Sequence, residues 1–169
     1  MATRKSTSKN TEKKTFSGDR LNICVVVSQW HKDITDALLE GVFQVFEKTE
    51  ADRFSMEVIN VSGSYELPLG AQWSIEYHKP DAVICLGCII RGETPHFEYI
   101  SKTVTDGIMQ LNLEHRIPVI FGVLTTDTIK QAKQRSGGKH GNKGADAANA
   151  AIEMIELRDK LKQQYASKS

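Results

Sequence analysis

The segment Ala82–Ile100, AVICLGCIIRGETPHFEYI, carries more information about the fold than any other stretch of the chain. Its first part, Ala82–Ile90, is an apolar run long enough for a buried strand, and it stops abruptly at Arg91. A segment with helical spacing begins directly after Pro95. In a parallel α/β sheet the carboxyl ends of strands bind ligands, because loop backbone and helix N-termini meet there. The junction from Arg91 to His96 combines a cation, a glycine, a hydroxyl group and an imidazole, which suits anion binding and proton transfer.

Three further apolar runs have the length of a strand: Leu21–Ser28, Met56–Val61 and Val119–Leu124. Most of the runs are nearly continuous, which indicates strands that are buried on both faces. Helical spacing of apolar residues fills the intervals, and further helices are predicted over residues 128–135 and 145–162. The order β-α-β-α-β-α-β-α-α predicts a three-layer α/β/α sandwich around a four-stranded parallel sheet. So small a sheet leaves an edge to cover, and oligomerisation is one way to cover it.

Length and charge divide the chain of 169 residues into a tail and one domain. Residues 1–15 hold five cationic residues and one acidic residue, which gives this segment a charge of +4 and the remainder −3. Because the segment has almost no apolar residues, we expect a disordered basic tail, more simply a solvated extension than a nucleic-acid arm. Residues 16–169 are predicted to form the single domain, without a signal peptide or a membrane span, and a cytoplasmic location is expected. No nucleic-acid or membrane partner is expected, since the excess of positive charge lies in the tail.

The cysteines and glycines point to no metal or organic cofactor. Cys85 and Cys88 have the spacing of a redox pair, but residues three apart on a strand point to opposite faces. We therefore expect Cys24, Cys85 and Cys88 to be structural. No grouping of His, Asp, Glu or Cys has convincing metal-ligand spacing, and neither a dinucleotide-binding fingerprint nor a phosphate-binding P-loop is present.

The predicted strand ends present four clusters of residues to one edge of the sheet. They are residues 29–31, 63–66, 91–96 and 125–127. In the first cluster Trp30 can stack on a planar heterocycle, although a packing role is equally compatible with the sequence. In the second, Glu66 can accept hydrogen bonds from a ring or hydroxyl group, but an acid at a helix start is also common.

His96 is the most promising proton-transfer residue of the third cluster. An imidazole at a helix N-terminus is disfavoured as a cation, so its neutral form is expected to be available as a base. A solvated surface histidine is the alternative. Glu93 and Thr94 lie just before it, where free N–H groups and a hydroxyl can hold a phosphate. A second glycine-rich, basic loop spans residues 136–144 and leads into the last helix.

On these residues the chain closely resembles the 6,7-dimethyl-8-ribityllumazine synthase family, from about Gly18 to Leu161. The resemblance rests on SGSYELP (Ser62–Pro68), GCIIRGETPHFEYI (Gly87–Ile100), FGVLTT (Phe121–Thr126) and GNKG (Gly141–Gly144). It implies a flavodoxin-like fold and an enzyme of riboflavin biosynthesis. The implied reaction condenses 5-amino-6-(D-ribitylamino)uracil with 3,4-dihydroxy-2-butanone 4-phosphate and releases phosphate and water, without a metal or an organic cofactor.

The resemblance also implies a role for each matching residue. It places Trp30 against the pyrimidine ring, where many members of the family have phenylalanine, and makes His96 the residue that moves protons. The implied contacts to ribitylaminouracil come from Ser64, Tyr65, Glu66, the backbone of Cys88, Ile89 and Ile90, and Phe121 of a neighbouring subunit. The implied contacts to the butanone phosphate come from Glu93, Thr94 and Arg135. Arg135 suits this task because a guanidinium can pair with two phosphate oxygens at once.

The same resemblance implies a pentamer with active sites shared between subunits. It places the strand just before Leu21 on the sheet of the next subunit, and association with riboflavin synthase is a further implied partner. The loop Gly137–Gly141 looks like the compact turn of shell-forming relatives, and this resemblance favours twelve pentamers closed into a sixty-subunit shell over a lone pentamer. Two rival hypotheses remain at this point. One is a flavodoxin-like module that only binds a flavin or phosphosugar, and the other is a structural shell protein.

Overall fold

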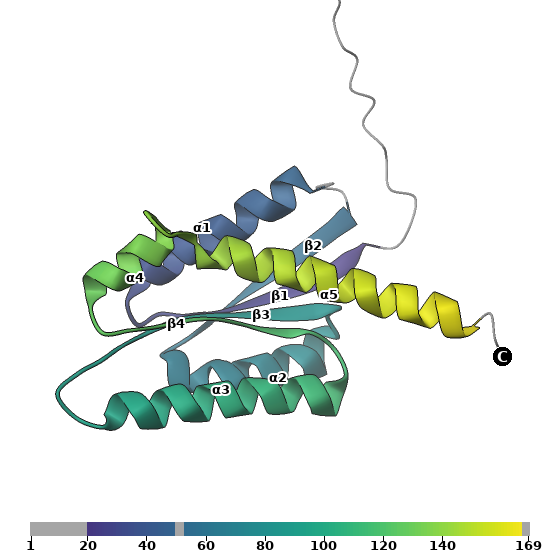
Figure 1. Ribbon diagram of the computed structural model, residues 1–169. Helices are drawn as coiled ribbons and strands as arrows, with labels where there is room; N and C mark the ends of the chain where they lie inside the picture. The colour runs from purple at the N-terminus through teal and green to yellow at the C-terminus, as the bar shows by residue number, and fades with distance from the viewer. Residues whose placement is uncertain (1–19, 50–52, 167–169) are drawn as a thin grey trace, which may run out of the picture.

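The computed structural model describes residues 20–49 and 53–166, so the predicted basic tail and the predicted strand before Leu21 lie outside the described residues (Figure 1). The predicted order of strands and helices is confirmed. The main elements are β1 Leu21–Ser28, α1 Lys32–Lys48, β2 Phe54–Val61, α2 Leu67–His78, β3 Ala82–Ile90, α3 His96–His115, β4 Val119–Thr126, α4 Ile129–Arg135 and α5 Lys143–Ala166. Three short elements join them: the 3₁₀ helix η2 Ser64–Glu66 and the strands β5 Ser136–Gly138 and β6 Gly141–Asn142.

Two strands are longer than the apolar pattern predicts. β2 begins at Phe54 rather than Met56, because it pairs in register with the whole of β1 from Leu21 onward. β4 continues past Leu124 to Thr126, because its last residues pair with Ile89 and Ile90 of β3. Backbone pairing with a neighbour therefore extends both strands beyond the residues whose side chains are apolar.

The four long strands form one parallel sheet in the order β2-β1-β3-β4. From β1 the chain moves to one side for β2, then returns across β1 to place β3 on its other side. The direction of winding therefore reverses between β1 and β3, and the loops that leave these strands diverge. In open α/β sheets such a switch point forms the ligand-binding crevice at the carboxyl ends of the strands.

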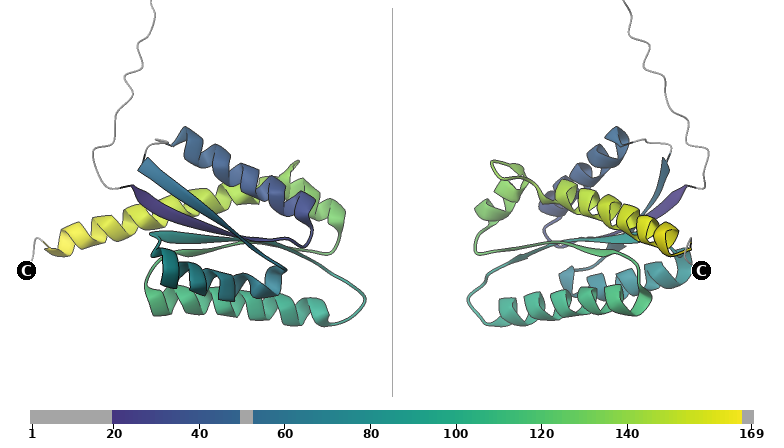
Figure 2. Two further views of the ribbon diagram at one scale, coloured as in Figure 1. Left: turned by 180° about the vertical axis from the view of Figure 1, so that it is seen from behind. Right: turned by 45° about the vertical axis from the view of Figure 1, so that its right-hand side comes forward.

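Helices cover both faces of the sheet, which confirms the three-layer α/β/α prediction. Helices α1, α4 and α5 lie on one face and α2 and α3 on the other (Figures 1 and 2). Successive residues of β1 alternate between the two layers, so that Val25 packs with α1 and α5 whereas Val26 packs with α2 and α3. Cys85 and Cys88 likewise belong to opposite cores, as their spacing on a strand predicts. Burial raises the pKa of both thiols to about 12, so they stay protonated at neutral pH.

The glycine-rich loop between α4 and α5 is a two-stranded hairpin, β5–β6, which the sequence pattern does not predict. Gly137 and Gly141 adopt φ values of 109° and 75°, in the left-handed region where a side chain is strained. Asn142 then starts α5, because its Oδ1 accepts hydrogen bonds from the backbone N–H groups of Gly144 and Ala145 at 2.8 and 3.4 Å. Within the described residues no helix is long and apolar enough to span a membrane.

Candidate active site

Three of the four predicted clusters meet in one cavity of about 270 Å³ at the switch point between β1 and β3. The cavity is lined by the end of β1, the loop and 3₁₀ helix after β2, the end of β3 and the start of α3. Its lining residues are Trp30, His31, Gly63, Ser64, Tyr65, Glu66, Cys88, Ile89, Ile90, His96 and Ile100. Most of the residues that the sequence assigns to the ribitylaminouracil site are therefore together in a single chain.

The loop after β1 presents an aromatic face to solvent. The indole of Trp30 is 68% exposed, so it is not a packing residue of this chain. His31 follows it in the left-handed conformation, with φ 59°, and its carbonyl oxygen accepts hydrogen bonds from the N–H groups of Ile34 and Thr35. A non-glycine residue in this conformation costs free energy, which a binding loop can retain when the surrounding structure fixes it. The turn leaves Trp30 free for a planar ligand.

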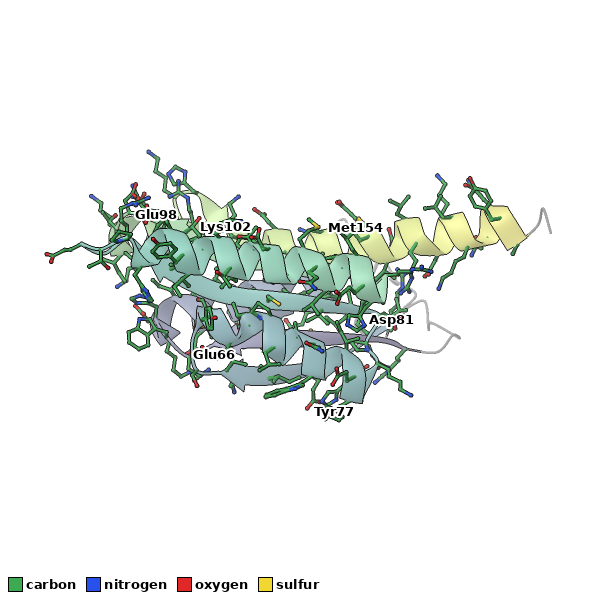
Figure 3. The ribbon with its side chains drawn as sticks, turned by 90° about the horizontal axis from the view of Figure 1, so that it is seen from below. Glu66, Tyr77, Asp81, Glu98, Lys102 and Met154 are labelled. Atoms are coloured by element: carbon green, nitrogen blue, oxygen red, sulfur yellow. The ribbon has the colours of Figure 1, made fainter. Side chains whose placement is uncertain are left out.

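The 3₁₀ helix η2 brings polar groups to the second wall of the cavity. Ser64 is buried, and its Oγ has no hydrogen-bond partner among the described residues. Tyr65 and Glu66 are exposed, and the chain enters α2 immediately after them with Pro68 in the first turn. Figure 3 shows Glu66 at the same end of the molecule as Glu98 in the first turn of α3. A buried hydroxyl without a partner and an exposed carboxylate suit a polyhydroxylated or ring-nitrogen ligand.

The third wall comes from the end of β3 and the start of α3. The side chains of Cys88 and Ile89 are buried in the two cores, which leaves the strand backbone as the part of these residues able to meet a ligand. His96 is exposed and is the first residue of α3, directly after Pro95. Glu93 and Thr94 are exposed on the loop between them and do not line this cavity. The structure thus places the predicted proton-transfer residue beside the predicted pyrimidine site.

Phe121 and Arg135 lie apart from this cavity, in a second one of about 380 Å³ on the flank of β4. Phe121 lies within β4 and is partly exposed. Arg135 ends α4, and its Nη1 donates a hydrogen bond to the carbonyl oxygen of Gln131 at 3.1 Å. Lys143 and Asp146 of α5 complete a charged wall, with 2.6 Å between Nζ and Oδ2. This cavity combines an aromatic ring with two cations, a suitable arrangement for one end of a phosphorylated ligand.

All four clusters lie at the carboxyl-terminal edge of the parallel sheet, as predicted, but the fourth cluster does not share the cavity of the other three. Thr125 and Thr126 line the second cavity, and Asp127 is held by Arg91. The reason is the strand order, because β4 is the outermost strand and its free flank faces away from the switch point.

His31 and Lys143 line these cavities and lie within segments that the sequence analysis names, residues 29–31 and 136–144, but no role was assigned to either side chain. Asp146, which lines the second cavity beside Lys143, was not foreseen. Its position three residues after the GNKG lysine is the signal that could have found it. Among the described residues no cluster of three or more His, Cys, Asp and Glu side chains is arranged to hold a metal ion.

Comparison with known proteins identifies the family of the chain. A family model for 6,7-dimethyl-8-ribityllumazine synthase matches residues 20–159. The chain belongs to the 6,7-dimethyl-8-ribityllumazine synthase family. A protein of that name from Parabacteroides distasonis is 50% identical over 137 residues, which cover 81% of this chain and 86% of the relative. Another from Cytophaga hutchinsonii is 47% identical over 145 residues, 83% of this chain and 91% of the relative. One from Phocaeicola vulgatus is 44% identical over 145 residues, 86% of each chain.

Proposed function

We propose that the two cavities of neighbouring copies join into one active site for the reaction of this family. As a lumazine synthase, the enzyme condenses 5-amino-6-(D-ribitylamino)uracil with 3,4-dihydroxy-2-butanone 4-phosphate and releases phosphate and water in riboflavin biosynthesis. The observation that carries the proposal is the separation of Phe121 and Arg135 from the cavity of Trp30 and His96. A single chain offers the pyrimidine half-site at the switch point and an aromatic, cationic half-site on the flank of β4. Two copies placed head to tail bring the two halves together.

The chemistry needs proton transfers more than it needs a strong nucleophile. The aryl amine attacks the ketone and water leaves to form an imine. Phosphate then departs by elimination, and a second carbonyl condensation closes the ring. Each step moves a proton on nitrogen, carbon or oxygen, and an imidazole such as that of His96 can serve these transfers, which typically contribute ~10²–10⁴-fold. Holding two substrates in register supplies much of the remaining acceleration, since the reaction becomes effectively unimolecular.

The two half-sites divide the recognition of the substrates. Trp30 stacks on the pyrimidine ring, while Ser64 and Glu66 bind its polar edge and the ribityl chain. Arg135 of the neighbouring copy pairs with the phosphate of the second substrate, because its fork matches two phosphate oxygens. Phe121 of that neighbour closes the ring pocket. Glu93 and Thr94 complete the phosphate side through the loop that leads to α3.

Complementary surfaces of the chain support a head-to-tail assembly. Helix α2 exposes an apolar stripe of Leu69, Trp73 and Tyr77, spaced four residues apart along one side of the helix. An apolar groove of about 590 Å³ lies between α3 and α5. Its lining residues include Leu113, Met154, Leu157, Leu161 and Tyr165, together with Arg116 and Lys162. Figure 3 shows Tyr77 and Met154 on different flanks of the molecule, as a ring with a repeating heterologous contact requires.

Charge also matches between the stripe and the groove. Glu76 lies between Trp73 and Tyr77 on α2, whereas the groove carries the cations Arg116 and Lys162. A second copy of the chain is therefore a suitable occupant of the groove. We propose a ring of five copies, with twelve rings in a shell of sixty favoured by the compact β5–β6 hairpin. A cytoplasmic location and an association with riboflavin synthase remain predictions from the resemblance.

Two measurements test this function. The first mixes the purified protein with both substrates and follows the fluorescence of the lumazine product; absence of product would reject the assignment. The second tests the shared site by co-assembling His96→Ala and Arg135→Ala subunits in equal amounts. With sites built from two copies, about a quarter of them regain both side chains, so activity rises above that of either variant. Activity equal to the mean of the two variants would reject the shared site.

A further inference from the structure

The cation of the β3–α3 junction, Arg91, is engaged within the protein rather than open to a ligand. Its Nε donates a hydrogen bond to Oδ1 of Asp127 at 2.8 Å, and its Nη1 donates one to Oε1 of Glu98. Its guanidinium carbon also lies 4.3 Å from the ring centroid of Phe97. One side chain therefore contacts two consecutive residues of the first turn of α3 and one residue of the loop after β4.

These contacts surround the position of His96. His96 is the first residue of α3, and Phe97 and Glu98 are the next two. Pro95, the N-cap residue directly before the helix, provides no side-chain hydrogen bond to cap it. Arg91 supplies an alternative restraint, because stacking fixes Phe97 and the ion pair fixes Glu98. The backbone adds another tie, since the N–H of Arg91 donates to the carbonyl oxygen of Thr126 at 2.9 Å.

The same contacts neutralise two carboxylates near the proposed phosphate-binding side of the active site. The carboxylates of Glu98 and Asp127 would each repel a phosphorylated substrate. Arg91 forms an ion pair with both of them, which reduces this repulsion. The hydrogen bond from Arg91 lowers the pKa of Glu98 below its usual range, so this carboxylate stays charged and paired at neutral pH.

We propose that Arg91 is a positioning residue, which acts on the reaction by fixing the first turn of α3 and with it the imidazole of His96. The inference rests on the proposed function, because it assumes that His96 transfers protons there. It goes beyond that function by assigning Arg91 to no substrate. The β3–α3 junction and the loop after β4 then behave as one unit, joined by the guanidinium of Arg91 and by its backbone N–H.

A double-mutant cycle tests the coupling. We expect Arg91→Ala to lower kcat by roughly 10- to 10²-fold, since small displacements of a catalytic group have effects of this size, with a smaller change in KM for ribitylaminouracil. In the His96→Ala background the same substitution should lower kcat by less than about 2-fold, because the group it positions is already absent. Arg91→Lys should restore only part of kcat, since an ammonium lacks the planar fork and its stacking. Equal fold losses in both backgrounds, or no loss in either, would overturn the proposal.

Lys102→Ala is the matched control. Lys102 lies one turn further along α3 and pairs with Asp106 at 2.5 Å, away from the junction (Figure 3). We expect this variant to keep the kcat of the parent enzyme, and a loss as large as that of Arg91→Ala would reject a specific role for Arg91.

Amide hydrogen exchange provides a readout that does not depend on activity. Residues 91–100 should exchange faster in Arg91→Ala and in Asp127→Asn than in the parent or in Lys102→Ala. Unchanged exchange would reject the hypothesis that Arg91 restrains the first turn of α3, whatever reaction the enzyme catalyses. Faster exchange in a protein that makes no lumazine would leave the restraint standing and reject the proposed function.

Discussion

The side chain of Asn142 donates a hydrogen bond from Nδ2 to the carbonyl oxygen of Ala37, 105 residues earlier in the chain, at 2.7 Å. Because Oδ1 of the same side chain caps α5, one residue joins α1, the β5–β6 hairpin and α5. Two glycines make room for this contact. A Cβ on Gly41 would overlap the Asn142 side chain, and a Cβ on Gly144 would overlap the backbone of Leu38.

Replacing Gly144 should therefore destabilise the fold severely. We expect Gly144→Ala to lower the free energy of unfolding by at least about 3 kcal/mol, because the overlap is with backbone and not with a movable side chain. Gly92→Ala is the control, since nothing lies within 4 Å of a Cβ there, and it should unfold at nearly the parental temperature. Equal thermal unfolding of both variants would contradict the packing argument.

Loss of the imidazole of His96 should slow the reaction without unfolding the protein. His96 is exposed and makes no core contact, so we expect His96→Ala to keep the parental melting temperature. Its kcat should fall by about 10²-fold or more where proton transfer limits the rate. Steady-state fluorescence of the lumazine product measures this, and an unchanged rate at saturating substrates would remove His96 from the mechanism.

Arg135→Ala should weaken binding of the phosphorylated substrate alone. We expect its KM for the butanone phosphate to rise by ~10-fold or more, with little change for ribitylaminouracil, because a charge-assisted pair with phosphate is lost. Lys133→Ala, on the same helix and paired with Asp33 at 3.5 Å, serves as the control. A similar loss of affinity for both substrates would count against a phosphate clamp.

Much of the fold, but less of the site, could be predicted from the sequence. Most of the strands were predictable because their apolar runs are nearly continuous, and Ala82–Ile90 was predicted with its observed bounds. The β5–β6 hairpin was not predictable, since it depends on left-handed glycines and on the distant partner of Asn142. The local spacing of apolar residues contains no information about the glycine conformations or about the distant partner of Asn142.

The site shows the same division between local and distant information. Residues such as Ser64 and Glu66 follow one strand directly, so the pattern places them together. Phe121 and Arg135 lie on the far flank because β4 occupies the edge of the sheet, and strand order is a tertiary property. The pairing of Arg91 with Asp127 could not be read from the sequence for the same reason, because the two residues are 36 positions apart.

The apolar stripe of α2 offers a direct test of assembly. Trp73 is 52% exposed, so we expect Trp73→Glu to fold and to give a smaller native mass. Because the subunits no longer associate, this variant should also lose enzyme activity. Lys48→Glu on α1, which covers the opposite face of the sheet, should keep the parental mass (Figure 1). If Trp73→Glu assembled as the parent does, docking of α2 on a second copy would be wrong.

The buried thiols predict a specific response to alkaline pH. Burial raises the pKa of Cys85 to about 12, and burial with the charge of Glu57 raises that of Cys24 to about 11. The folded state therefore retains protons that the unfolded state releases above its own thiol pKa of about 8.5. Stability is fully present below that pH and falls as the pH rises toward 11, by roughly 1.4 kcal/mol per pH unit for each such thiol.

Thiol chemistry and denaturant titrations check this response. At pH 8 the native protein should resist alkylation, while the unfolded chain should react at its cysteines. Cys85→Ala should show a shallower decline of the free energy of unfolding above pH 9 than the parent. Rapid alkylation of the native protein at pH 8 would show that the cores open more readily than their packing implies.

The strand order puts one cavity at the switch point and the other on the flank of β4, and in the proposed shared site this separation fixes how many complete sites a given number of copies can hold. If the site is shared as proposed, a lone chain has two unmatched halves and no complete site, and an open row of chains leaves one half unmatched at each end. Only closure makes the number of sites equal to the number of chains. Dilution below the protein concentration at which rings close should therefore cause a steep loss of activity, although every chain remains folded. Enzyme activity would then depend on protein concentration without any regulatory ligand.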